Sequence, residues 1–102
     1  MKYERGVFLI KDINECRKRI DEIDDVLIKL FEERMEIAIS VANYKREHNL
    51  PIFNKEREDQ VIEKNLSKIK NEEIKEYGEK MIHCLMDLSK DYQKSLNNKD
   101  KR

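Results

Sequence analysis

Two cations near the middle of the chain, Arg34 and Lys45, stand in a stretch that is otherwise apolar along one helical face. They are 11 residues apart, which is about three turns of an α-helix, so their side chains point in nearly the same direction. A cation within an apolar surface is costly unless something negative meets it. The pair therefore predicts a site that binds an anionic small molecule and stabilises negative charge on it.

Arg17 lies on the same predicted helix but cannot share a small ligand with Arg34. The two positions differ by 17 residues, which places the side chains about 100° apart around the helix and roughly 25 Å apart along its axis. A ligand held by Arg34 and Lys45 of one helix could reach Arg17 only from an antiparallel neighbour. The alternative is that Arg17 is a surface cation paired with Asp21 or Asp24.

Further polar residues border the apolar faces expected later in the chain. Asn54 is expected to cap a helix whose first turns carry Arg57 and Glu58 beside apolar positions. Ser89 and Gln93 are one turn apart on a later helix. Each also has a simpler interpretation: Arg57 is a surface cation, Glu58 favours a helix start or neutralises the two cations described above, and Ser89 and Gln93 are ordinary polar residues on a helix flank.

Conventional catalytic groups are sparse. His48 and His83 are expected to be exposed to solvent. No set of Cys, His and carboxylate residues has the spacing of metal ligands, and no glycine-rich loop could hold phosphates. We therefore expect no metal and no cofactor, and a site that acts through binding and electrostatic stabilisation rather than nucleophilic or acid–base chemistry.

The helix that must position the three cations, expected over residues 12–48, is unusually long. Asp12 followed by Glu15 is a capping-box start, no Gly or Pro interrupts the stretch, and Asn49 and Pro51 end it. About 36 residues at ~1.5 Å each give a rod of roughly 54 Å, whereas a compact 100-residue domain has a radius of gyration of about 13 Å. The rest of the chain cannot cover such a rod, so we expect another chain to bury part of it.

Two shorter helices are expected to follow. One begins after Asn54, and the other begins after Asn71 and runs to about Leu96. The apolar residues expected to face inward are Val61, Ile62, Leu66 and Ile69 on the former, and Ile74, Tyr77, Met81, Leu85, Leu88, Tyr92 and Leu96 on the latter. The predicted fold class is all-α, with one very long N-terminal helix and two shorter ones. Residues 1–11 are expected to form an arm, 12–97 a helical domain and 98–102 a polar tail.

Composition narrows the classes of partner. The 102 residues include 22 Lys and Arg against 22 Asp and Glu, which argues against nucleic acid or an anionic membrane surface as the partner. No apolar run approaches the 18 residues of a membrane span, and the N-terminus lacks the hydrophobic segment of a signal peptide. A disulfide between Cys16 and Cys84 stays open, but we expect reduced thiols in a cytoplasmic protein.

Taken together, these residues resemble the all-helical chorismate mutases over nearly the whole chain, from about Asp12 to Leu96. The shared residues are Arg17, Asp24, Arg34 and Lys45 on the first helix, and Pro51, Asn54, Arg57, Glu58, Ser89 and Gln93 beyond it. Any one of them is common, but the intervals of 17 and then 11 residues between the three cations, together with the later residues, are specific. Asn54 stands where some members have Asp, and Asn also caps a helix and can contact a ligand hydroxyl.

The resemblance implies an intertwined homodimeric helical bundle with two equivalent sites, each completed by Arg17 of the partner chain. It also implies the rearrangement of chorismate to prephenate in aromatic amino-acid biosynthesis. That step is pericyclic, so it needs no covalent or acid–base group and no cofactor.

The resemblance further assigns a role to each candidate residue. Four of them would bind the two carboxylates of chorismate: Arg34 and the partner's Arg17 directly, with Arg57 and Ser89 nearby. The other four would contact substrate oxygens: Lys45 and Gln93 the ether oxygen, and Glu58, with help near Asn54, the ring hydroxyl.

Two other functions stay open on the sequence alone. The related isochorismate–pyruvate lyase shares the fold and the cationic site, although Glu58 favours the mutase because its carboxylate is placed for the chorismate hydroxyl. A non-catalytic helical dimer that serves as a regulatory or interaction module is the third possibility. Docking onto another enzyme of the shikimate pathway also stays open.

Overall fold

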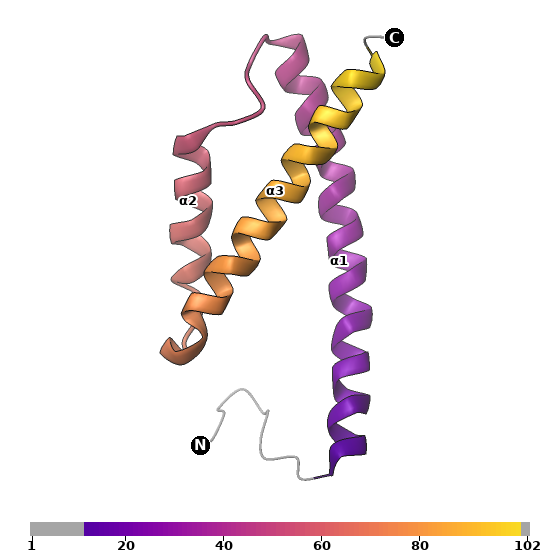
Figure 1. Cartoon of the computed structure of the whole chain (residues 1–102), viewed down its shortest axis with the longest axis vertical. Coiled ribbons are helices and arrows are strands. Elements are labelled where there is room, and N and C mark those ends of the chain that lie inside the picture. Colours follow the sequence, from indigo (N-terminus) through magenta and orange to yellow (C-terminus); the bar gives the residue numbers. More distant parts are fainter. Residues whose placement is uncertain (1–11, 101–102) are drawn as a thin grey trace. The chain divides into compact units, whose positions relative to one another are not determined.

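A computed structural model describes residues 12–100, and all the regular secondary structure of these residues is helical. The helices are α1 (Ile13–Glu47), α2 (Lys55–Leu66) and α3 (Lys75–Asp100), with a short 3-10 helix, η1 (Glu72–Ile74), directly before α3 (Figure 1). The predicted all-α class with one long and two shorter helices is confirmed. The expected arm, residues 1–11, and the last two residues of the expected tail lie outside the described residues. No helix within 12–100 is long and apolar enough to cross a membrane.

Both ends of α1 form as its local sequence predicts. Oδ1 of Asp12 accepts a hydrogen bond of 2.8 Å from the backbone N–H two residues later, which satisfies one of the unpaired amides of the first turn. At the other end Asn49 adopts a left-handed conformation with φ of 55°. Its N–H donates to the carbonyl of Arg46 at 3.3 Å, and the N–H of Leu50 donates to that of Lys45 at 2.7 Å. This pair of bonds is the Schellman arrangement that ends many helices.

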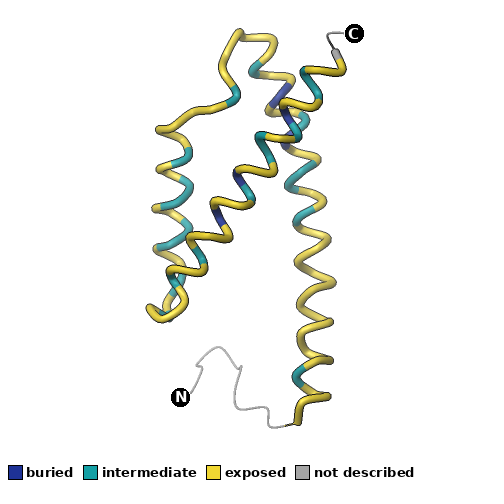
Figure 2. Tube along the Cα trace, viewed as in Figure 1, coloured by how far each residue is buried: buried dark blue, intermediate teal, exposed yellow. Residues whose placement is uncertain are grey.

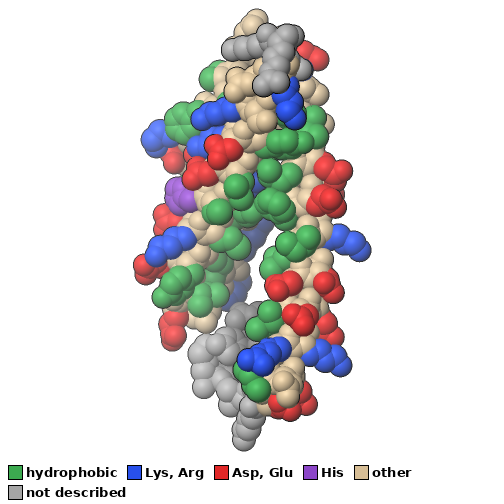
Figure 3. All heavy atoms as spheres, turned by 45° about the vertical axis from the view of Figure 1, so that its right-hand side comes forward, with side chains coloured by type: hydrophobic (Ala, Val, Ile, Leu, Met, Phe, Trp, Pro, Cys, Tyr) green, Lys and Arg blue, Asp and Glu red, His purple; other side chains and the backbone are tan. Residues whose placement is uncertain are grey.

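The chain divides into two units, Met1–Arg34 and Met35–Arg102, and α1 contributes residues to both. Among residues 12–34 of the first unit none is fully buried (Figure 2). Its exposed large apolar side chains are Ile13, Ile20, Ile23, Val26, Leu27, Ile28 and Leu30. Figure 3 shows hydrophobic side chains at the surface along α1, between acidic and basic ones. The first unit thus carries apolar surface that its own residues do not cover.

The buried residues of the second unit come from two helices. Ala38 and Ala42, near the C-terminal end of α1, are 4% and 1% exposed, and Ile82 and Met86 of α3 are each 7% exposed. Gln93 of α3 is also buried. This core is small, and one of its five members is polar.

Helix α2 packs against α3 in the second unit. Near the start of α3 the side chain of Ile69 lies so close to Gly78 that a Cβ on the glycine would overlap Ile69 Cδ1. Gly78 therefore permits the residues after α2 to approach the backbone of α3. The four residues predicted to face inward here, Val61, Ile62, Leu66 and Ile69, are half-buried.

The inward face of α3 differs from the predicted one. Four residues expected to face inward are exposed in the single chain: Ile74, Tyr77, Met81 and Leu88. The prediction is wrong for these four because α3 has two apolar faces, and the second unit buries the one that carries Ile82 and Met86. The other three, Leu85, Tyr92 and Leu96, are half-buried.

The limits of α3 also differ from the sequence-based expectation. Oδ1 of Asn71 accepts from the N–H of Glu73 at 3.0 Å and so caps η1, and α3 begins only at Lys75. At its other end α3 continues to Asp100. Residues 98–100, expected in a polar tail, are therefore helical.

Candidate functional site

The eight candidate residues are divided between the two units. Arg17 and Arg34 belong to the first, where Arg17 is exposed and Arg34 half-buried. The other six belong to the second: Lys45, Asn54, Arg57, Glu58, Ser89 and Gln93. Within the second unit the structure brings several of them together in pairs.

Lys45 is held by the connection that follows α1. Its Nζ donates a 2.7 Å hydrogen bond to the backbone carbonyl of Ile52. Burial lowers the pKa of Lys45, and the carboxylate of Glu58 partly counters this by raising it. A lowered pKa means that the protonated lysine costs stability at neutral pH, a cost relieved as the pH rises through the folded-state pKa. A cation retained where it costs stability is typical of a functional site.

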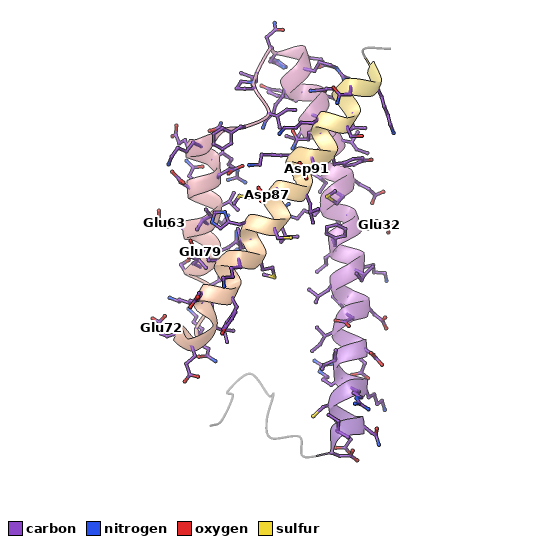
Figure 4. The ribbon with its side chains drawn as sticks, in the orientation of Figure 1. Glu32, Glu63, Glu72, Glu79, Asp87 and Asp91 are labelled. Atoms are coloured by element: carbon purple, nitrogen blue, oxygen red, sulfur yellow. The ribbon has the colours of Figure 1, made fainter. Side chains whose placement is uncertain are left out.

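Glu58 on α2 pairs with Lys90 on α3. The distance from Lys90 Nζ to Glu58 Oε2 is 2.8 Å, and the two side chains are only 21% and 20% exposed. Lys90 Nζ also lies 3.5 Å from Oδ1 of Asp87, which Figure 4 labels on α3. The hydrogen bond to Glu58 is the main cause that raises the pKa of Lys90 above its ordinary 10.5. The raised pKa of Lys90 therefore stabilises the fold at neutral pH, and on the alkaline side this contribution is lost as the pH rises through the folded-state pKa, above 10.5.

Lys90 is absent from the residues that the sequence patterns single out, although a signal for it exists. It lies four residues after Met86 and three before Gln93, so a helix places all three on one face. Met86 and Gln93 are both buried. A lysine on the same helix face as two buried residues is costly unless an anion pairs with it. The anion here is Glu58, which lies on another helix.

Ser89 and Gln93 form a hydrogen-bonded pair on α3. Gln93 is 4% exposed, and its Nε2 donates to Ser89 Oγ at 3.0 Å. Its Oε1 is buried without a hydrogen-bond partner in the described chain, which costs free energy. Since rotation of an amide exchanges its oxygen and nitrogen, the same side chain could present either a donor or an acceptor. The amide oxygen of Gln93 is therefore not used by the described part of the chain.

Asn54 and Arg57 serve the start of α2. Asn54 Oδ1 accepts a 3.0 Å hydrogen bond from the backbone N–H of Arg57, so the predicted helix cap is confirmed. The exposed side chain of Arg57 lines a hollow along α2, which it shares with Gln60, Glu63, Lys64 and Ser67; Glu63 is labelled in Figure 4. None of the other candidate residues lines this hollow.

The two histidines lie apart from these pairs. His48 is exposed, with Nδ1 2.8 Å from the carbonyl of Tyr44, and the half-exposed His83 lies 3.7 Å from Glu79. Both exposures agree with the sequence-based expectation. Within residues 12–100 no group of three or more Cys, His, Asp or Glu side chains could hold a metal ion.

The second unit thus offers a specific set of polar groups. They are two ammonium groups, a carboxylate, an amide and a hydroxyl: Lys45, Lys90, Glu58, Gln93 and Ser89. Ammonium and amide groups donate to a ligand oxygen that carries or develops negative charge. A carboxylate accepts from a hydroxyl. The set suits a ligand that has both.

Comparison with known proteins finds one family model and three relatives. The model for chorismate mutase type II matches residues 16–94. A protein of Methanocaldococcus jannaschii named chorismate mutase is 33% identical over 99 residues, which cover 92% of this chain and all of the relative. A bifunctional chorismate mutase/prephenate dehydratase of Aquifex aeolicus is 39% identical over 57 residues, or 56% of this chain and 16% of the relative. A T-protein of Haemophilus influenzae is 41% identical over 46 residues, or 45% of this chain and 12% of the relative. No solved structure matches.

The unused bonding capacity of Gln93 predicts an unusual response to substitution. Gln93→Met keeps an unbranched side chain of similar size but removes the buried, unpaired oxygen, whose burial costs about 1–3 kcal/mol. It also removes one hydrogen bond worth roughly 0.5–1.5 kcal/mol. We therefore expect the free energy of unfolding, measured by urea denaturation at a fixed protein concentration, to stay constant or rise by about 1 kcal/mol.

Met86→Gln is the matched control, because it places an unpaired amide at a buried apolar position of the same helix. It should lower the free energy of unfolding by about 1–3 kcal/mol. A loss of more than about 1 kcal/mol in Gln93→Met would mean that the amide stabilises the chain, contrary to this expectation.

Proposed function

The chain belongs to the chorismate mutase type II family, and on that premise we propose that it is an isomerase that converts chorismate to prephenate. The observation that carries the proposal is the polar set of the second unit, where the buried Gln93, the partly buried Lys45 and the acid Glu58 occur within one folded unit. The domain responsible spans residues 12–97.

The chemistry of the rearrangement matches what this set can do. One carbon–oxygen bond breaks while a carbon–carbon bond forms, and no proton or covalent intermediate is involved. An enzyme can accelerate such a step by holding the reactive conformer and by stabilising negative charge on the ether oxygen as it leaves. In our proposal Lys45 and Gln93 donate to that oxygen, and Glu58, near Asn54, accepts from the ring hydroxyl.

We assign the carboxylates of chorismate to arginines of two chains. Arg34 of one chain and Arg17 of a partner bind them directly, with Arg57 and Ser89 nearby. The homodimer that this assignment requires is supported by the exposed apolar side chains of the first unit and by the exposure of Arg17. Roughly 25 Å of helix axis separates Arg17 from Arg34, so a single chain could not bring both to one small ligand.

We further propose a cytoplasmic location and a role in aromatic amino-acid biosynthesis. The 102 residues contain two cysteines, Cys16 and Cys84, whereas small proteins of oxidising compartments are often dense in disulfides. The name of the Aquifex relative joins a mutase and a dehydratase in one chain. That fusion supports docking of the present chain onto another enzyme of the shikimate pathway.

The direct test is to add the purified protein to chorismate, to follow the loss of chorismate absorbance, and to identify the product. We expect prephenate. Incubation with isochorismate serves as the parallel reaction. Pyruvate release from isochorismate without prephenate formation would indicate the lyase instead, and no turnover of either substrate would indicate a non-catalytic helical dimer.

Sharing of the site between chains predicts complementation. Arg17→Ala and Arg34→Ala should each be nearly inactive, because each removes a charge-assisted contact to the dianion. In a mixed dimer one of the two sites keeps both arginines. Random subunit exchange should therefore restore up to roughly a quarter of the wild-type activity per protomer.

Arg34→Ala mixed with Lys45→Ala is the control, because both residues are assigned to the same chain's side of the site. Every site of that mixture has a lesion, so activity should stay low. If exchange is verified and the Arg17→Ala and Arg34→Ala mixture stays as inactive as the control, the two arginines do not come from different chains.

The role of Gln93 predicts a pH-dependent variant. Gln93→Glu keeps the shape but donates a hydrogen bond only when its carboxyl group is protonated, and burial favours that neutral form. At pH 7.5 the carboxylate would repel the developing negative charge, and loss of one such donor typically costs about 10²–10³ in rate. The variant should be poor at pH 7.5 and recover substantially towards pH 5, whereas Gln93→Ala stays poor throughout. Wild-type activity with a flat pH profile in Gln93→Glu would place Gln93 outside the site.

A further inference from the structure

Lys90 lies at a junction of three segments of the second unit. Its ammonium group is 2.8 Å from Glu58 Oε2 on α2 and 3.5 Å from Asp87 on its own helix. It also lies 5.0 Å from the centre of the Phe53 ring, in the connection before α2, within the range of a cation–π contact. With only 21% of its side chain exposed, Lys90 loses much of its hydration, and these three groups replace it.

The pair has a geometric consequence for Glu58. A carboxylate has two oxygens and about four lone-pair directions. The contact with Lys90 uses Oε2, which leaves Oε1 to accept from a ligand hydroxyl. Because Lys90 is itself held by Asp87 and Phe53, its contact with Oε2 restricts the positions that the Glu58 carboxylate can adopt.

The pair has an electrostatic consequence as well. An unpaired Glu58 would repel a ligand with two carboxylates, and repulsion is strong where water is partly excluded. Lys90 cancels that charge without removing the acceptor. Lys45 offsets part of that charge, since Glu58 raises its pKa, but its Nζ donates to the carbonyl of Ile52 and the proposed function assigns it to the ether oxygen, whereas Lys90 contacts Glu58 directly.

We propose that Lys90 is a positioning residue, which orients and neutralises Glu58 so that this carboxylate can accept the hydroxyl of a dianionic substrate. This inference rests on the proposed function and adds to it a residue, Lys90, that acts through Glu58 rather than by touching the substrate.

The kinetic test compares Lys90→Met, Glu58→Gln and the double variant, with chorismate as substrate. In the wild-type background Lys90→Met should lower kcat/KM roughly tenfold, mainly through a higher KM, and Lys90→Arg should restore most of it. In the Glu58→Gln background, Lys90→Met should change kcat/KM less than about threefold, because nothing is left for Lys90 to position.

Lys80→Met on the same helix is the matched control. Lys80 also pairs with a carboxylate, Glu76, at 3.8 Å and lies 5.8 Å from the ring of Tyr77, but its side chain is 71% exposed. Exposed pairs of this kind contribute little. We expect wild-type kcat and KM for this variant, and an equal loss in Lys80→Met and Lys90→Met would overturn the proposal.

A spectroscopic readout separates the ion pair from catalysis. In an NMR titration of the lysine side chains, Glu58→Gln should lower the pKa of Lys90, since the hydrogen bond to Glu58 is the main cause that raises it. A pKa of Lys90 that does not change in Glu58→Gln would overturn the proposal. Equal losses of kcat/KM from Lys90→Met in the wild-type and Glu58→Gln backgrounds would also overturn it, because they would indicate direct contact of Lys90 with the substrate.

The outcomes for the two proposals are distinguishable. If the wild-type protein is active and either contrary result is found, only the role of Lys90 is refuted. If the wild-type protein is inactive, the proposed function is refuted and the role of Lys90 with it.

Discussion

The constraint on which the rest of the structure depends is that α1 has more apolar surface than its own chain can cover. The helix is 35 residues long, and the chain buries only two of them, both alanines. Fully burying a large aliphatic side chain contributes roughly 1.5–3 kcal/mol. The exposed set of the first unit, each member about half exposed, therefore represents on the order of 5–10 kcal/mol that the single chain does not gain. Burial by a second copy would account for the length of α1 and for the separation of Arg17 from Arg34.

The second unit shows the opposite balance, since it buries one polar side chain, Gln93, and partly buries another, Lys45. Burial lowers the pKa of Lys45, and Gln93 holds a buried oxygen that has no hydrogen-bond partner among residues 12–100. Both features cost free energy in a domain whose core is small. A ligand that carries negative charge and supplies the missing hydrogen bonds would relieve both costs. Chorismate mutase activity would explain why the chain keeps Lys45 and Gln93 at positions where they cost free energy.

Sequence reasoning succeeded where the decisive partner is nearby in the chain. Asp12, Asn49 and Asn54 act on backbone groups within a few residues, so their capping roles could be read from local patterns. The same holds for Ser89 and Gln93, which meet because they are one helical turn apart.

Sequence reasoning failed where the partner of a residue lies on another helix. Periodicity predicts one inward face on α3, which includes Met81, whereas the structure buries a second apolar face that carries Ile82. Sequence patterns did not identify Lys90 because its partner, Glu58, is 32 residues earlier in the chain. Only the packing of α2 against α3 brings the two side chains together. The capping residue Asn71 was identified, but not the 3-10 turn that it begins, because both helix types accept the same cap.

The uneven burial along α1 should also affect the rates of amide exchange and the order in which the chain folds. A helix without tertiary support is only marginally stable in water, and local opening exposes its amides to exchange with solvent at low energetic cost. In an isolated chain, amides of α1 before Met35 should exchange quickly, and those around Ala38 and Ala42 slowly, within one continuous helix. The contacts of α2 with α3 join segments that are close in sequence, which favours rapid formation. The second unit would then be the folding nucleus, on which the first part of α1 becomes ordered last.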